Sequence, residues 1–240
     1  ATLHRMNRIA IGLCFAVGCT SGGTKTDSQS TASTSESPRT DTADPSPGDT
    51  GETPVESHTF PDNPYEELRE QGVDRYLGVY EPITRYPDGT GGTAHGFTGA
   101  DSGPVCMYGG AFYTMTRDQS HDDLVIFLQG GGLCYSELCM AIGSGGRQFL
   151  DLDILSNDPE VNPTASWNQV YVPYCDGSLF GGDVDTDEDG DGIPERRQRG
   201  LKNISAAIDV AHGEFPNPRR ILLSGSSGGG YGTIIATMLV

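Results

Sequence analysis

A motif near the end of the chain constrains the fold more than any other feature. Residues 221–229 read Ile-Leu-Leu-Ser-Gly-Ser-Ser-Gly-Gly, an apolar run that leads into G-x-S-x-G. This pattern is typical of a strand that turns sharply into a helix and exposes a serine hydroxyl at the turn. Only Ser227 has glycines two positions before and two positions after it. We therefore predict Ser227 as a nucleophile and give Ser224 and Ser226 little weight.

The partners that a serine nucleophile needs do not follow it within this sequence. In the hydrolase fold that uses such a turn, the acid and the histidine come after the serine in chain order. Residues 228–240 contain neither Asp nor His. The upstream histidines offer no good base, because we place His121 in a turn and interpret His95 and His212 as surface residues.

Apolar runs and helical spacing predict an α/β fold. Residues 124–128 and 170–172 form apolar runs typical of strands buried on both faces. Apolar side chains recur at helical spacing over 201–211, and 221–224 reads as a third strand. Because a strand–helix–strand unit joins parallel strands, we expect a mostly parallel sheet with flanking helices. Residues 231–240 should begin the helix behind the serine.

A glycine loop follows the first of these strands. Residues 130–134 read Gly-Gly-Gly-Leu-Cys, so backbone N–H groups can approach a substrate oxygen without side chains in the way. Acyl transfer needs such donors for the negative charge of its tetrahedral intermediate. The N–H of Gly228 would complete this oxyanion hole. A tight turn after a strand would use the same glycines. The glycines indicate an oxyanion hole only in combination with the serine motif that follows them in the chain.

The amino-terminal quarter of the chain differs in composition from the rest. Residues 20–58 contain only Ala32, Ala43 and Val55 as apolar side chains, so we expect a disordered linker over 20–59 and one folded domain over 60–240. Residues 1–19 have the basic start and short apolar run of a secretory signal. The signal ends in a lipobox-like Cys19, which predicts a lipid anchor in a membrane; a plain signal with a chance cysteine is the alternative.

Charge and cysteine usage agree with an exported protein. The formal charge of −18, from 33 acidic and 15 basic residues, argues against a nucleic-acid partner. Cys106, Cys134, Cys139 and Cys175 form an even set, which predicts two disulfides in one of three pairings. One pairing closes a short loop between Cys134 and Cys139 and leaves a long-range bridge. A zinc site is disfavoured because no histidine falls at ligand spacing.

An acidic segment over residues 183–195 has the features of a calcium loop. Carboxylates at alternate positions, interrupted by glycines, can wrap one hard cation. The segment resembles the calcium loops of thrombospondin type 3 repeats, although it occurs once and ends in Glu. An EF-hand register starting at Asp185 puts Gly190 correctly at position six but Arg196 where a bidentate Glu belongs. A solvated acidic loop is the alternative to a structural calcium site, whose predicted ligands are Asp185, Asp187, Asp189, Asp191 and Glu195.

Three ordered segments resemble the pectin acetylesterase and Notum family of carboxylesterases: residues 125–134, 167–178 and 223–229. The resemblance implies an α/β-hydrolase fold, a Cys134–Cys139 bridge, and a triad Asp and His beyond Val240. It also implies Ser227 as nucleophile with backbone donors at Gly131, Gly132 and Gly228. The chain departs from the family pattern at Gln129, Leu133, Ser226 and Gly228.

These features together predict a secreted serine carboxylesterase without an organic cofactor. Its substrate would be an ester, such as an O-acyl group on a glycan or on another extracellular molecule. The alternative is a catalytically inactive, calcium-binding surface lipoprotein that uses the hydrolase scaffold for binding. Ester hydrolysis that depends on Ser227 would separate the two.

Overall fold

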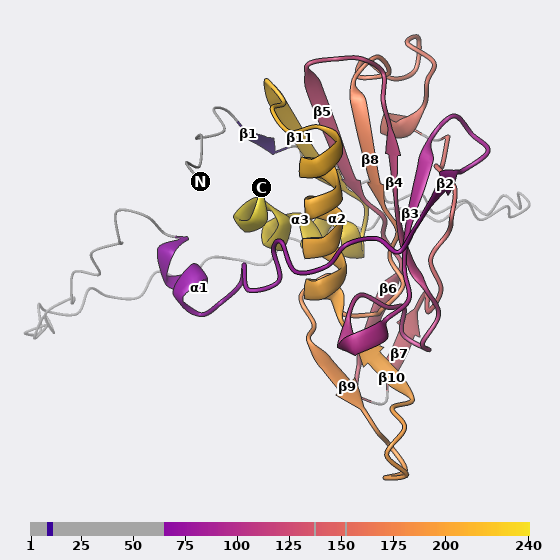
Figure 1. Ribbon diagram of the computed structural model, residues 1–240, viewed down its shortest axis with the longest axis vertical. Helices are drawn as coiled ribbons and strands as arrows, with labels where there is room; N and C mark the ends of the chain where they lie inside the picture. Colours follow the sequence, from indigo (N-terminus) through magenta and orange to yellow (C-terminus); the bar gives the residue numbers. More distant parts are fainter. Residues whose placement is uncertain (1–8, 12–64, 137, 152) are drawn as a thin grey trace, which may run out of the picture. The chain divides into compact units, whose positions relative to one another are not determined.

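The computed structural model describes residues 9–11, 65–136, 138–151 and 153–240 (Figure 1). Residues 9–11 and the described residues of 65–240 belong to one compact unit. The predicted linker and Cys19 therefore lie outside the described residues, as does the predicted signal apart from the backbone of 9–11. No helix in the described ranges is long and apolar enough to cross a membrane.

A mixed sheet forms the centre of the fold, in the order β1-β11-β5-β8-β4-β3-β2. Its parallel strands are β1 (Ile9–Ile11), β11 (Arg220–Gly225), β5 (Asp123–Leu128) and β8 (Asn168–Val172). The antiparallel strands are β4 (Phe112–Arg117), β3 (Thr93–Phe97) and β2 (Thr84–Pro87). The expectation of a mostly parallel sheet is wrong at this second half, where β2, β3 and β4 follow one another in the chain as antiparallel neighbours and β4 also pairs antiparallel with β8.

The strands predicted from apolar runs are present. β5 and β8 are buried along nearly their whole length, as expected for strands covered on both faces. β5, β8 and β11 extend the expected ranges by one or two residues at their ends. The crossover from β8 through a helix to β11 does join parallel strands, since both strands pair in parallel with β5 between them.

Two long helices cover one face of the sheet. α2 (Gly200–Glu214) packs on β4 and β8, and α3 (Gly228–Leu239) packs on β5 and β11 and against α2 (Figure 1). α2 confirms the helix expected over 201–211, whereas α3 begins three residues before the expected start at 231. Short helical turns complete the described elements: α1 (Glu66–Glu70), η1 (Ala100–Ser102) and η2 (Asp153–Leu155).

Alternate side chains of the strands divide the core into two clusters. Val170 and Val172 join the main cluster under the two helices. Tyr171 points to the opposite face, where it packs with Phe149 and Met115. The segment that carries Phe149 and η2 therefore covers the second face of the sheet.

Two hairpins extend from the end of the sheet at which β5 and β8 finish (Figure 1). The first pairs β6 (Gly132–Tyr135) with β7 (Leu138–Ala141), and the second pairs β9 (Val184–Thr186) with β10 (Arg196–Gln198). Disulfides join Cys134 to Cys139 across the first hairpin and Cys106 to Cys175 over a separation of 69 residues. These two bridges confirm the short-loop pairing among the three that the sequence allowed.

Candidate functional site

Ser227 lies in the sharp turn between β11 and α3. β11 ends at Gly225 and α3 begins at Gly228, so only Ser226 and Ser227 separate the strand from the helix. Ser227 has φ 48° and ψ −119°, a left-handed conformation that is strained for a residue with a Cβ. Its side chain is exposed, and its hydroxyl makes no hydrogen bond within the described residues. The turn therefore presents a serine hydroxyl to solvent at the end of a buried strand.

Glycines around the turn are required by close backbone contacts. A Cβ on Gly225 would lie 2.4 Å from the carbonyl oxygen of Gly229, and one on Gly229 would lie 2.1 Å from that of Leu128. A Cβ on Gly130 would lie 2.4 Å from the carbonyl oxygen of Ser226. The motif glycines thus allow the elbow to pack against the end of β5 and the glycine loop.

The glycine loop is held against the elbow on one side and against β8 on the other. The N–H of Gly130 donates to Oγ of Ser226 at 3.1 Å. The N–H of Gln129 donates to the carbonyl oxygen of Val172 at 2.9 Å, and its side-chain Oε1 accepts the N–H of Tyr174 at 3.2 Å. Gln129 therefore has a structural role in this chain, because it ties the glycine loop to the end of β8.

Two of the three predicted oxyanion donors come together beside Ser227. The position of a Cβ on Gly228 is 3.8 Å from the N atom of Gly131 and 3.2 Å from the carbonyl oxygen of Gly132. Neither the N–H of Gly131 nor that of Gly228 donates to another described residue. Gly132 has φ +86° and begins β6, where a Cβ would lie 1.7 Å from the carbonyl oxygen of Met140. The arrangement can offer Gly131 and Gly228 to a developing negative charge.

No histidine of the described ranges contacts Ser227. His95, which we expected at the surface, is 1% exposed and shares a hydrogen bond with Thr116 at 2.9 Å. Burial lowers the pKa of His95 to about 4. His121 accepts the N–H of Asp123 at 3.0 Å at the opposite end of β5. A base for Ser227 is therefore not supplied by residues 65–240 as described.

A buried acid supports the loop beside the elbow. Asp176 is 1% exposed and accepts the hydroxyl hydrogen of Ser178, whose Oγ accepts the N–H of Gly182 at 3.0 Å. Burial raises the pKa of Asp176 to about 6, although hydrogen bonds from Ser178 and Gly200 oppose the shift. This carboxyl was not singled out from the sequence, where its only signal was its place in the segment after a buried strand.

The raised pKa predicts a specific pH dependence of stability. Because the folded pKa exceeds the unfolded value of 3.8, the folded state holds the proton more tightly and loses stability as pH rises from about 4 to about 6. Asp176→Asn should remove this loss. Urea unfolding of wild type and Asp176→Asn at pH 4 to 7 measures the loss. The lowered pKa of His95 makes both proteins more stable as pH rises, and subtracting one unfolding free energy from the other cancels this contribution. A difference in unfolding free energy that does not change with pH would contradict the assignment.

The acidic segment forms the tip of the β9–β10 hairpin. Carboxylate oxygens of Asp187, Asp189, Asp191 and Glu195 lie within 4.8 Å of one another. Three of the four side chains are exposed, and Asp187 accepts the N–H groups of Gly190 and Gly192 at 2.7 and 2.8 Å. The structure thus brings together four of the five predicted calcium ligands.

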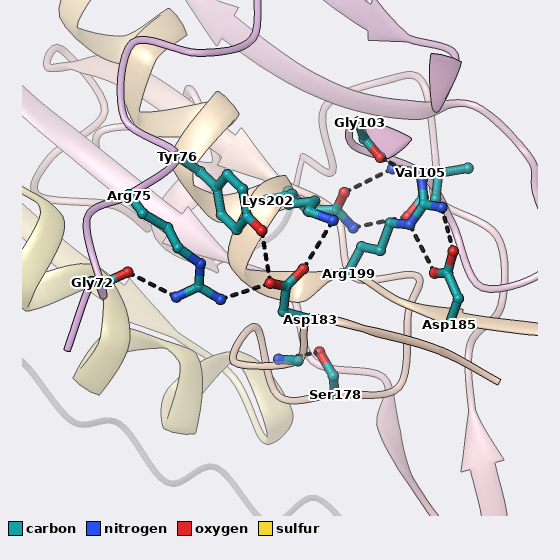
Figure 2. A network of polar contacts seen from close by, with 12 residues as sticks. Gly72, Arg75, Tyr76, Gly103, Val105, Ser178, Asp183, Asp185, Arg199 and Lys202 are labelled. Atoms are coloured by element: carbon teal, nitrogen blue, oxygen red, sulfur yellow. Dashed lines mark hydrogen bonds and ion pairs between the residues drawn. The ribbon is translucent and has the colours of Figure 1, made fainter. Parts of the chain in front are cut away.

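Asp185 does not join this cluster, which corrects its prediction as a ligand. The side chain lies at the base of the hairpin, where Nε of Arg199 donates to its Oδ1 at 2.8 Å and Nη2 of Arg199 donates to Oδ2 (Figure 2). Arg199 also donates to the carbonyl oxygen of Gly103 at 3.0 Å. Both carboxylate oxygens of Asp185 pair with Arg199, away from the four clustered carboxylates, so Asp185 fixes the hairpin to the start of α2.

Asp183 anchors the same hairpin to the segment before β2. Figure 2 shows its carboxylate between Arg75, Tyr76 and Lys202. Its oxygens lie 2.6 Å from Nη2 of Arg75, 2.7 Å from Oη of Tyr76 and 2.9 Å from Nζ of Lys202. Although burial alone would raise the pKa of Asp183, these hydrogen bonds hold it at about 2. The acidic tip is therefore carried on a base that is firmly attached to the domain.

Comparison with known proteins identifies relatives over the same region. A family model described as Pectinacetylesterase matches residues 97–238, which is more than half of the chain. Pectin acetylesterase 4 of Arabidopsis thaliana is 28% identical over 151 residues, covering 56% of this chain and 36% of the relative. Pectin acetylesterase 11 of the same plant is 30% identical over 148 residues, covering 55% and 37%.

An animal protein matches as well. Palmitoleoyl-protein carboxylesterase notum2 of Xenopus laevis is 29% identical over 140 residues, covering 52% of this chain and 27% of the relative. The chain spans about a third of the length of the curated relatives it matches. The family match includes the elbow with Ser227, the glycine loop and the disulfides. The chain belongs to the pectinacetylesterase family.

Proposed function

We propose that this protein is a serine carboxylesterase that cleaves an O-acyl ester on a glycan or another extracellular molecule. The observation that carries the proposal is the exposed hydroxyl of Ser227 in a strained turn, beside the unengaged N–H groups of Gly131 and Gly228. Membership of a family whose named relatives are acetylesterases and a carboxylesterase supports the same bond type.

The proposed reaction proceeds through an acyl-enzyme. Ser227 Oγ attacks the ester carbonyl, and a histidine takes the hydroxyl proton and passes it to the leaving alcohol. The N–H groups of Gly131 and Gly228 hold the oxygen that becomes negative, and each such donor contributes about 3 kcal/mol in comparable sites. Water then hydrolyses the acyl-enzyme with the same histidine as base. We place this histidine and its aspartate after Val240, and no organic cofactor takes part.

The test is hydrolysis by the full-length protein. Saturable release of acid from 4-nitrophenyl acetate and from an acetylated polysaccharide supports the proposal. A folded, calcium-loaded full-length protein that hydrolyses neither these esters nor longer-chain ones would reject it. That result would favour the inactive binding lipoprotein instead.

We further propose that the protein acts outside the cytoplasm, anchored in a membrane through Cys19. The two disulfides support an oxidising compartment, because such bridges are rare where thiols are kept reduced. Mass spectrometry of the mature amino terminus tests the anchor. A diacylated Cys19 is the expected result, and a mature chain that begins elsewhere without lipid would contradict it.

We propose a structural calcium ion at the tip of the β9–β10 hairpin, held by Asp187, Asp189, Asp191 and Glu195. Four carboxylates this close repel one another unless a cation balances them, and hard oxygen ligands suit calcium. The ion would pin the tip and would not enter the reaction.

Calcium should raise the melting temperature of the protein. At a free concentration of about 100 times Kd, the added stability would be about 2.7 kcal/mol, and EDTA should remove it. Asp189→Asn should abolish the calcium-dependent shift. Glu188→Gln is the matched control, because Glu188 pairs with Arg196 at 2.6 Å and lies outside the cluster. Equal melting temperatures in calcium and EDTA would rule the ion out.

A further inference from the structure

The loop between β8 and β9 forms a wall of the candidate site that no sequence motif predicted. Cδ2 of Leu179 lies 3.2 Å from the position of a Cβ on Gly228, the same position that is 3.8 Å from the N atom of Gly131. The Leu179 side chain is partly exposed. Its methyl groups therefore border the space next to both N–H groups that are offered to a substrate oxygen.

The backbone at this wall is strained. Leu179 has φ 56° and Phe180 has φ 64°, two successive left-handed residues with Cβ atoms. Glycine would adopt these angles without cost, so leucine is kept here at a loss of conformational free energy. Strain of this kind marks functional sites when the surrounding structure enforces it.

Buried neighbours enforce the conformation. Oη of Tyr174 accepts the N–H of Leu179 at 2.9 Å, and the Tyr174 ring packs on Phe180 with centroids 5.1 Å apart. Phe180 is 1% exposed, and Oγ of Ser178 ties the loop together between Asp176 and Gly182. The same Tyr174 ring would contact a Cβ on Gly131 at 2.5 Å. One buried tyrosine thus fixes Leu179 relative to the glycine loop.

The wall has no group that could protonate a leaving alcohol. Tyr174 is fully buried, and burial raises its pKa to about 12. Asp176 is enclosed beneath Ser178. An apolar surface next to the two N–H donors suits the hydrocarbon part of an acyl group better than a polar alcohol.

We propose that Leu179 is the specificity-determining residue for the acyl group, and that its side chain limits the size of the acyl chain the site accepts. This inference rests on the proposed esterase function. A shorter side chain at position 179 would open space beside Gly228 without touching Ser227 or the donors. Each extra methylene that fits into an apolar site changes kcat/KM by about tenfold or more.

The test uses the full-length protein and two substrate series. In 4-nitrophenyl esters from acetate to hexanoate only the acyl chain varies, and in acetates of different alcohols only the leaving group varies. Leu179→Ala should raise the hexanoate-to-acetate ratio of kcat/KM by about tenfold or more and leave the alcohol series unchanged. Leu179→Gly, which relieves the strained φ and so preserves the fold, should raise the same ratio. Leu179→Met, which keeps a side chain of similar volume, should retain the wild-type preference.

A matched control is Leu150→Ala, which shortens an exposed leucine in the segment between β7 and η2. It should leave both series unchanged. If the Leu179 variants slow all esters equally, or shift the alcohol series instead, the proposal is overturned while the esterase function stands. If wild type hydrolyses no ester, or Ser227→Ala hydrolyses as fast as wild type, the esterase function itself fails and this inference falls with it.

Discussion

Ser227→Ala in the full-length protein should lower kcat for ester hydrolysis by about 10⁴-fold or more, with little change in unfolding free energy. Loss of the nucleophile removes the covalent route and leaves only the rate enhancement from binding and from the oxyanion donors. The exposed hydroxyl of Ser227 makes no hydrogen bond within the described residues, so its removal breaks no contact that they provide. Steady-state kinetics and urea unfolding measure the two quantities.

The neighbouring serine provides the comparison. Ser226 is also exposed, but its Oγ accepts the N–H of Gly130 at 3.1 Å and so supports the glycine loop. Ser226→Ala should therefore lose far less activity than Ser227→Ala. A larger loss of activity in Ser226→Ala than in Ser227→Ala would show that Ser227 is not the nucleophile.

Gly229→Ala should destabilise the domain by about 3 kcal/mol or more. The added methyl would lie 2.1 Å from the carbonyl oxygen of Leu128 and 2.7 Å from that of Gln129. Both are backbone atoms at the end of β5, so neither can rotate away, and α3 must move off the sheet. Urea unfolding of the full-length variant measures the loss.

Gly230→Ala is the matched control one residue along the same helix. Its methyl would meet nothing nearer than the carbonyl oxygen of Gly225 at 3.4 Å, an ordinary contact. Alanine also favours the helix over glycine by up to about 1 kcal/mol, so this variant should be neutral or more stable than wild type. Equal destabilisation by both substitutions would mean that α3 does not approach β5 as described.

The parts of the fold predicted from sequence were those with strong local patterns. β5 and β8 are buried on both faces, so their residues form unbroken apolar runs that identify them. α2 shows helical spacing because one side packs on the sheet. The elbow could be predicted for a different reason. Close backbone contacts leave no room for a Cβ at Gly225 or Gly229, so the turn requires the glycines of the motif.

The antiparallel half of the sheet escaped prediction because several of its buried residues are polar and interrupt the apolar ones. β4 ends in Thr114, Thr116 and Arg117, each buried, with Arg117 bonded to the carbonyl oxygen of Leu155 and to Gln169. His95 in β3 is buried through its hydrogen bond to Thr116. These side chains form hydrogen bonds with one another across strands, and the local sequence pattern does not indicate partners that are so distant in the chain.

The residues of the candidate site were predictable where a local motif determines the backbone conformation. They were not predictable where contacts with residues distant in the sequence determine the position of a side chain. Ser227 and Gly228 follow from the elbow itself. Asp185 has the right residue type and spacing for a metal ligand, but its carboxylate pairs with Arg199, which lies 14 residues away in the chain. Leu179 looks like any loop leucine in the sequence, and only the packing of Tyr174 and Phe180 places it beside Gly228.

The most direct test of the account is to find which residue of the full-length protein an active-site serine reagent modifies. A fluorophosphonate probe forms a stable adduct with an activated serine, and peptide mapping by mass spectrometry locates it. We predict one adduct, on Ser227, which is absent from Ser227→Ala and is blocked by prior incubation with an ester substrate. An adduct on another serine, or none in a protein that hydrolyses esters, would contradict the assignment of Ser227 as the nucleophile.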